Sequence, residues 1–107
     1  MTKLYQRVYQ LLRTVPRGRV TTYKALALAV NTQAYRAIGQ AMHHNPDAPL
    51  IPCHRVVKSN GTLGGFMGQT SGKELERKKA LLRSEGVKVS GNKIVNFAET
   101  LYTFTAT

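Results

Sequence analysis

The first pattern along the chain is a stripe of apolar residues at helical spacing near the N-terminus. Leu4, Val8, Leu11 and Leu12 recur three and four positions apart, which places them on one face of a helix. The stripe stops at a Pro-Arg-Gly sequence, whose residues favour a turn. The pattern therefore predicts an amphipathic helix over residues 3–14 with one buried face.

Two further helices are predicted in the first half of the chain. Either Thr21 or Thr22 can cap a helix that reaches about Val30, because a threonine hydroxyl accepts from the first free backbone amides. The polar stretch 31–33 interrupts this helix, and a third helix is predicted over residues 34–43. Two short helices joined by a tight turn are typical of a helix-turn-helix.

The middle of the chain is not helical. Three of the four prolines lie in residues 45–52 and make this segment stiff. An Asn-Gly turn at residues 60–61 separates the β-prone residues 53–58 from 62–63, which predicts a small hairpin. The glycine-rich residues 64–72 then read as a loop.

The last strong helix is predicted over residues 73–84, and a second possible hairpin turns at residues 90–92. The basic residues of this helix are most simply a solvated face: Lys73, Arg77, Lys78, Lys79 and Arg83. A hairpin that follows a helix-turn-helix is a wing. The expected fold class is mainly α with a small β-hairpin, a single winged helix-turn-helix domain over residues 1–107.

Composition adds a partner to this picture. The 107 residues carry 16 basic and 5 acidic side chains, a formal net charge of +11, which favours a polyanion such as nucleic acid over an anionic membrane. The single cysteine excludes an intrachain disulfide and a cysteine-rich zinc site, so no metal is expected. No signal peptide or membrane span is visible, and the expected location is the cytoplasm, on the nucleoid, or the nucleus of a eukaryote.

The candidate chemistry lies where the proline-rich loop enters the β-prone run. A lone cysteine is usually a small buried apolar residue, and a lone histidine is usually structural. Here Cys53 and His54 are adjacent, follow the rigid Pro52 and belong to a very basic chain. A neighbouring histidine or positive potential favours the thiolate, so the pair is also a candidate nucleophile with its base.

The same residues carry a resemblance to a known family. Residues 52–56, Pro-Cys-His-Arg-Val, resemble the active-site signature of the O6-alkylguanine-DNA alkyltransferases. Residues 36–46 resemble that family's recognition helix and asparagine hinge, and residues 20–23 resemble the start of its first helix-turn-helix helix. Residues 61–68 and 81–86 look like its later loop and helix. The resemblance covers nearly the whole chain and matches the family's C-terminal DNA-binding domain.

The resemblance implies direct-reversal DNA repair by five catalytic residues. Cys53 would attack the alkyl carbon of an O6-alkylguanine flipped out of the duplex and keep the group irreversibly. His54 would take the thiol proton through a water, and Glu85 would orient His54. Asn45 would fix the turn ahead of the cysteine, and Tyr23 would donate a proton or hydrogen bond to the departing guanine oxygen. No cofactor is implied.

The resemblance also implies a monomer that docks in the minor groove of double-stranded DNA. Arg36 would fill the gap left by the flipped base, and small residues would let its helix approach closely. The expected DNA-facing residues are Thr22, Tyr35, Arg36, Ala37, Gly39, Ala41 and Arg55, and the expected pocket residues are Met42, Val56, Phe66 and Met67. Phe66 stands where the family usually has tyrosine, and Met67 replaces a small polar residue.

Two rival interpretations stay open. Alkyltransferase-like proteins resemble this short domain, bind O6-alkylguanine without transfer and flag it for nucleotide excision repair proteins. They characteristically replace the cysteine, whereas Cys53 is present here. A winged-helix transcription regulator would fit the predicted helices, but it gives no reason for the Pro-Cys-His-Arg sequence.

Overall fold

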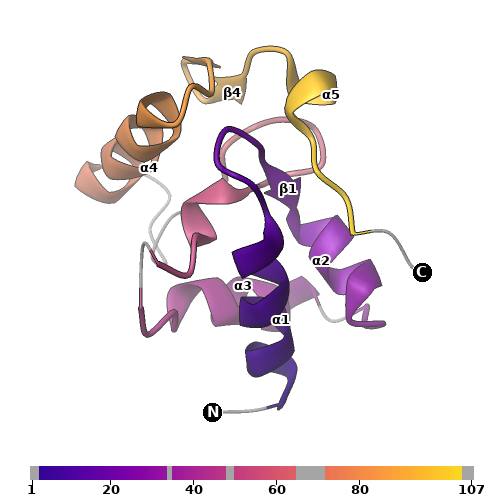
Figure 1. The fold of residues 1–107 in the computed structure, drawn as a ribbon. Coiled ribbons are helices and arrows are strands. Elements are labelled where there is room, and N and C mark those ends of the chain that lie inside the picture. The colour runs from indigo at the N-terminus through magenta and orange to yellow at the C-terminus, as the bar shows by residue number, and fades with distance from the viewer. Residues whose placement is uncertain (1–2, 34, 48–49, 65–71, 105–107) are drawn as a thin grey trace.

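The computed structural model describes residues 3–33, 35–47, 50–64 and 72–104 (Figure 1). Short helices dominate these residues, and the strands are only two residues long. In chain order the elements are α1 (Lys3–Thr14), β1 (Thr21–Thr22), α2 (Tyr23–Ala29), α3 (Tyr35–His43), a 3₁₀ turn (Cys53–Arg55), β2 (Val56–Val57), α4 (Lys73–Ser84), β3 (Val89–Ser90), β4 (Lys93–Ile94) and α5 (Phe97–Thr100).

The first three helices confirm the sequence-based prediction. The Thr22 hydroxyl caps α2 by accepting from Ala25 N at 3.0 Å, and Asn31 ends the helix region with a left-handed φ of 58°. Both α1 and α2 pack against α3, and Leu12 of α1 and Ile38 of α3 are fully buried. This helical layer forms one of two apolar cores among the described residues, and that core contains Cys53.

The hairpin predicted after residue 58 is wrong in its pairing. Residues 58–62 do form a tight turn, but β2 pairs in parallel with β1, in the register Thr21↔Val56 and Thr22↔Val57. The physical reason is burial: Val56 and Val57 are both fully buried, and a strand covered on both faces suits the interior better than an exposed wing. This pairing places the start of α2 beside the cysteine turn.

After α4, the chain forms a hairpin and then returns to lie beside the residues that precede β1. Helix α4 has the predicted bounds, and β3 and β4 pair antiparallel around the predicted turn. Helix α5 was not predicted. After it, Leu101 bridges Val20 and Tyr102 N donates to Val20 O, so the last described segment runs beside β1 (Figure 1).

The basic face predicted for α4 needs one correction. Lys73, Arg77 and Arg83 are exposed as expected, but Lys78 is fully buried. Its ammonium donates to Val56 O at 2.7 Å and to Leu63 O at 2.5 Å. These carbonyls need donors in the interior, and Lys78 supplies them. Among the described residues, no helix is long and apolar enough to cross a membrane.

Candidate active site

The cysteine lies at the first position of the 3₁₀ turn and is shielded from solvent. Cys53 is only 4% exposed, and its backbone N–H donates to Ile51 O at 2.8 Å. Burial raises the pKa of the Cys53 thiol, although a hydrogen bond from Asn45 and the charge of Lys78 act to lower it. The resting side chain is therefore the thiol, and its use as a nucleophile requires a base nearby.

A buried histidine follows the cysteine directly in the sequence, and its hydrogen bonding suits a base. His54 Nε2 lies 3.0 Å from Glu85 Oε2, and a carboxylate can only accept, so Nε2 carries the proton. The other ring nitrogen, Nδ1, is buried without a hydrogen-bond partner among the described residues. Burial lowers the pKa of His54 more than Glu85 raises it. The imidazole is therefore neutral, with Nδ1 able to accept a proton.

Glu85 is held from two sides. Arg55 donates to both of its carboxylate oxygens, from Nε at 2.9 Å and from Nη2 at 2.7 Å. Burial acts to raise the pKa of Glu85, but the hydrogen bonds from Arg55 and His54 outweigh it and hold the pKa below its usual value. Arg55 also donates to Val15 O at 2.8 Å. The carboxylate is thus fixed and charged where an imidazolium would form.

This arrangement corrects the expected role of Arg55. Arg55 was expected on the DNA-facing surface, but its side chain is only 15% exposed and donates to Glu85 and to Val15 O. A guanidinium already engaged in a two-point ion pair has lost the freedom to contact a phosphate. Arg55 belongs to the support of the histidine.

Asn45 connects the end of α3 to the segment before the cysteine. Its side-chain Nδ2 donates to Ile51 O at 2.7 Å, and its Oδ1 accepts from Asp47 N at 2.9 Å. The residue is buried, so both bonds are sheltered from water. Asn45 therefore fixes the path of the chain from α3 into the 3₁₀ turn.

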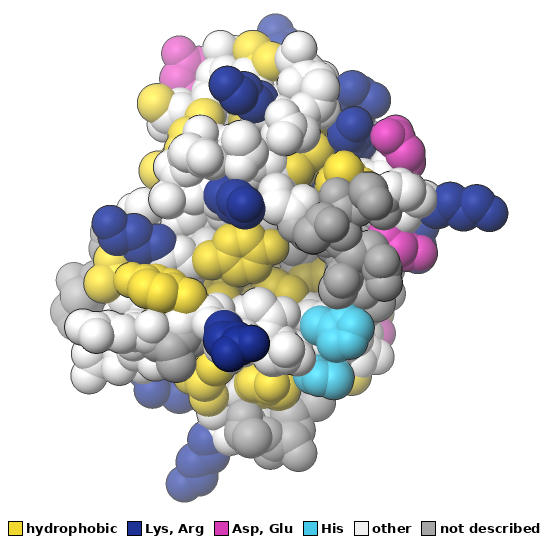
Figure 2. All heavy atoms as spheres, turned by 180° about the vertical axis from the view of Figure 1, so that it is seen from behind, with side chains coloured by type: hydrophobic (Ala, Val, Ile, Leu, Met, Phe, Trp, Pro, Cys, Tyr) yellow, Lys and Arg dark blue, Asp and Glu magenta, His cyan; other side chains and the backbone are white. Residues whose placement is uncertain are grey.

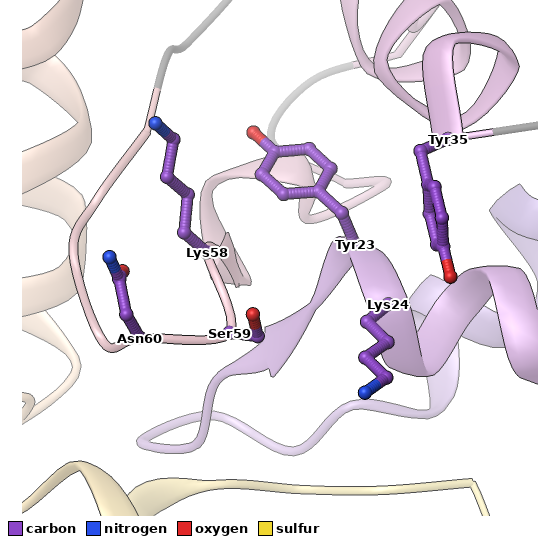
Figure 3. Close-up of a pocket in the computed structure, with 6 residues that line it drawn as sticks. All are labelled: Tyr23, Lys24, Tyr35, Lys58, Ser59 and Asn60. Carbon is purple, nitrogen blue, oxygen red and sulfur yellow. The ribbon is translucent and has the colours of Figure 1, made fainter.

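Tyr23 is the first residue of α2 and lies at the opening of this region. Burial, with a smaller contribution from Cys53, raises the pKa of Tyr23 to about 12, so the phenol keeps its proton. The ring lines a cavity of about 340 Å³ together with Lys24, Tyr35, Lys58, Ser59 and Asn60 (Figure 3). Tyr23 is thus a hydrogen-bond donor at the edge of an open cavity.

Helix α3 presents only part of the surface expected of it. Tyr35 is 49% exposed, Arg36 is exposed, and Ala37 and Gly39 are half-buried. Ala41 is fully buried and its carbonyl accepts from the Tyr9 hydroxyl at 2.8 Å, so the expectation of a DNA contact there is wrong. Its position on the α1-facing side of α3 is the reason.

Burial changes one further expectation, the DNA contact of Thr22, and leaves the pocket role of Met42 and Val56 a prediction. Thr22, expected to face DNA, is buried and its hydroxyl serves as the cap of α2. Met42 and Val56, expected in the pocket, are buried, and Val56 O accepts from Lys78. Phe66 and Met67 lie outside the described residues.

Lys78 also belongs to this region, although it was expected on the solvated face of α4. Burial lowers its pKa to about 7, and the Cys53 thiolate acts in the opposite direction. The signal was its spacing, because Leu75, Lys78 and Leu82 lie three and four positions apart on α4. A lysine at an apolar position of a helix indicates that buried acceptors are present for its ammonium group.

Figure 2 shows Lys and Arg side chains spread over the rear face, with the few acidic side chains near its margins. Within the described part of the chain, no group of three His, Cys, Asp or Glu residues could hold a metal ion. The groups described above are a thiol, a neutral imidazole, a fixed carboxylate and a phenol.

Comparison with known proteins defines the class. Residues 3–87 match the family described as "6-O-methylguanine DNA methyltransferase, DNA binding domain", and the chain belongs to this family. Its mainly helical fold with small sheets is the fold of that domain. The expected family is confirmed.

Particular relatives include methylated-DNA–protein-cysteine methyltransferases. The one from Metallosphaera sedula is 49% identical over 83 residues, which cover 78% of this chain and 50% of that protein. The one from Candida glabrata is 45% identical over 93 residues, 86% of this chain and 42% of that protein. The chain spans half or less of the length of these two relatives.

Solved structures of two kinds resemble the chain. S. pombe Atl1, in complex with damaged DNA containing O6-carboxymethylguanine, has a TM-score of 0.82 and 30% identity and covers 96% of this chain and 97% of its own. Mycobacterium tuberculosis OGT in complex with DNA has a TM-score of 0.71 and 39% identity and covers 80% of this chain and 50% of its own.

Proposed function

We propose that this protein repairs O6-alkylguanine in duplex DNA by moving the alkyl group to Cys53, once per molecule. The observation that carries the proposal is the buried chain of groups behind the cysteine. His54 donates to Glu85 through Nε2 and keeps Nδ1 available for the proton of a neighbouring thiol. The family of the chain and the DNA complexes of its structural relatives support the same function.

The transfer balances without a cofactor. The Cys53 thiol gives its proton to His54 Nδ1, through a water as the family resemblance implies, and the sulfur attacks the alkyl carbon. The C–S bond forms as the C–O bond to guanine breaks. Tyr23, protonated because its pKa is about 12, donates a hydrogen bond to the leaving guanine. The guanine takes up one proton from water, and the His54 imidazolium returns one proton to water, so the proton count balances. The thioether has no route back to a thiol, so each molecule reacts once.

The helices supply the DNA-binding part of the proposal. Helices α2 and α3 act as a helix-turn-helix, with α3 in the minor groove and Arg36 in the space vacated by the flipped base. Exposed Arg36 and the half-buried small residues Ala37 and Gly39 support this orientation.

The test is an intact-mass measurement after incubation with duplex DNA that contains O6-methylguanine. The expected result is a gain of one methyl group per protein molecule, absent in Cys53→Ala. A titration should end at one repaired lesion per protein. Repair of many lesions per molecule would refute the single-turnover mechanism.

A second candidate function is a lesion sensor that binds O6-alkylguanine and recruits nucleotide excision repair proteins. The observation in its favour is coverage: Atl1 aligns with 96% of this chain, whereas the M. tuberculosis enzyme aligns with 80%. The same mass measurement separates the two. Tight binding to lesion DNA with no gain of mass would favour the sensor.

A further inference from the structure

We propose that Lys58 makes the cavity beside Tyr23 select O6-alkyl substituents that carry a negative charge, such as carboxymethyl, over neutral substituents of the same size. Lys58 would pair with the carboxylate of the substituent while the carbon bonded to guanine O6 moves to Cys53. This inference rests on the proposed function, because it takes the position of O6 from the hydrogen bond that Tyr23 donates. It assigns a specificity-determining residue and adds no step to the transfer.

The parallel pairing of β1 and β2 brings Lys58 and Tyr23 together. Thr22 lies opposite Val57, so the next residues, Tyr23 and Lys58, leave the sheet at the same end. A Cβ at Gly64 would lie 3.4 Å from Lys58 Cγ and 3.4 Å from the Tyr23 hydroxyl oxygen, so both side chains border one point. Figure 3 shows both side chains extending to the same side, with the Lys58 ammonium and the Tyr23 hydroxyl at their ends.

The turn that carries Lys58 is held by hydrogen bonds. Lys58 N donates to Thr62 O at 2.9 Å, and Gly61 N donates to Lys58 O at 2.9 Å. The Asn60 side chain accepts from Thr62 N at 3.1 Å and from Thr62 Oγ1 at 2.7 Å. Because the backbone is already ordered, an anion that binds Lys58 has to order only its side chain.

No carboxylate of the described residues neutralises Lys58. The Lys58 side chain is exposed and forms no ion pair among these residues. The described residues include all five acidic residues of the chain, which are Asp47, Glu74, Glu76, Glu85 and Glu99. Glu74, Glu76 and Glu85 pair with other basic side chains. The charge of Lys58 is therefore available to an anion of the substrate.

The cavity has room for a substituent on the base. Its volume of about 340 Å³ is in the range of small-ligand sites. Tyr35 lines it with an aromatic ring, and Ser59 and Asn60 add polar groups (Figure 3). In the proposed reaction O6 lies one hydrogen-bond length from the Tyr23 hydroxyl, and the substituent begins at O6. The carboxylate of a carboxymethyl group lies just beyond the reacting carbon, within reach of the Lys58 side chain.

A phosphate of the DNA backbone is the other anion that an exposed lysine meets. Carboxylates and phosphates both accept charge-assisted hydrogen bonds from an ammonium group. The position of Lys58 beside the Tyr23 hydroxyl favours the substituent, because this hydroxyl is the group that bonds the alkylated oxygen. The two sources are separable, since every duplex has the phosphate and only an acidic lesion has the carboxylate.

The test compares two lesions that differ in charge and have nearly the same shape. Duplexes carry O6-carboxymethylguanine or its neutral amide, O6-carbamoylmethylguanine. Transfer to an excess of the full chain is followed by intact mass, and the ratio of the acid rate to the amide rate is measured. Lys58→Gln should lower this ratio about fivefold, as expected for an ion pair between partly exposed groups.

Two variants and the salt concentration serve as controls. Lys58→Arg should keep the ratio, because the charge is kept. Lys24→Gln removes another lysine that lines the same cavity, but Figure 3 shows the Lys24 side chain extending away from Tyr23, so this variant should leave the ratio unchanged. Added salt should lower the ratio for the unmodified protein and have little effect on it for Lys58→Gln.

Binding by Cys53→Ala separates this inference from the proposed function. This variant has no thiol, so its affinities for the acid and amide duplexes report recognition alone. If the unmodified protein transferred no alkyl group, the proposed function would be wrong, and Lys58→Gln in the Cys53→Ala background would still test Lys58.

Two results would overturn the role of Lys58. The first is an acid-to-amide ratio of affinities that is the same with and without Lys58→Gln. The second is an equal loss of affinity for the acid, the amide and O6-methylguanine duplexes, which would indicate that Lys58 contacts a backbone phosphate.

Discussion

At the scale of single residues, the site consists of buried polar groups that are hydrogen-bonded to one another. His54, Glu85 and Arg55 form one such set, and Lys78 with two carbonyls forms another. In each set, a buried polar group left without its partner would cost more free energy of folding than the intact pair contributes. Removal of one member should therefore have a large effect on stability or on the site.

For Lys78, the effect of losing a buried partner should appear in the free energy of unfolding. Burial lowers its pKa from 10.5 to about 7, so between these values the unfolded chain binds a proton that the folded chain does not. The free energy of unfolding therefore rises as pH increases above about 7. Lys78→Met should flatten this rise and, by leaving two carbonyls without a donor, cost about 2–3 kcal/mol at neutral pH.

The measurement is urea unfolding of both proteins between pH 7 and 9. Above that interval Cys53 and Tyr23, whose pKa values are raised by burial, contribute with the opposite sign. Lys73→Met, at an exposed position of α4, is the control and should leave stability unchanged. Equal stability and equal pH profiles for Lys78→Met and the unmodified protein would contradict the pairing.

Glu85 should show its effect in the reaction rather than in DNA binding. Burial lowers the pKa of His54 below 6.5, so the neutral base is present at neutral pH and is lost only as pH falls below 6.5. The transfer rate should therefore be level near neutrality and decline at lower pH. Glu85→Gln removes the charge that stabilises the imidazolium and should slow transfer about 100-fold.

Single-turnover mass spectrometry across pH measures this rate, and binding of lesion DNA by Cys53→Ala/Glu85→Gln measures affinity separately. Glu74→Gln, on the outer face of α4, should have neither effect. A Glu85→Gln protein that reacts at the full rate would contradict the role of the Glu85 charge in the transfer.

At the scale of elements, periodicity predicted the helices well and the strand pairing badly. Apolar spacing and caps are local signals, and they predicted α1 and α4 with their observed bounds. The Asn-Gly turn is also local and is present, but the partner of β2 is β1, more than thirty positions earlier. A run of two valines carries no information about which distant strand it meets.

The same limit applies to the site residues. Cys53, His54 and Asn45 are close in sequence, and their motif could be read directly. The family resemblance was needed to add Glu85, and no local signal indicated that Arg55 would bind it rather than DNA. The positive charge of Lys78 predicts an exposed side chain, whereas its place in the apolar spacing of α4 predicts a buried one, and the structure shows it buried.

At the scale of the whole molecule, the net charge of +11 favours binding to any DNA, and this attraction weakens as the salt concentration rises. Sequence-independent attraction of this kind cannot by itself distinguish a damaged base from an undamaged one. Lesion preference must come from groups that gain contacts only after the base has left the stack.

Arg36 is the residue through which this argument can be tested. It is exposed near the start of α3, next to the exposed Tyr35, and the proposed docking places it in the space of the flipped base. Arg36→Ala should weaken binding to O6-methylguanine duplex about tenfold more than binding to undamaged duplex of the same sequence. Arg7→Ala removes the same charge from an exposed position of α1 and should leave the ratio of the two affinities unchanged. Both ratios are measured at one salt concentration, because each affinity alone reports mainly the net charge. If Arg36→Ala lowered the two affinities equally, Arg36 would be one more phosphate contact, and lesion recognition would rest on the cavity beside Tyr23.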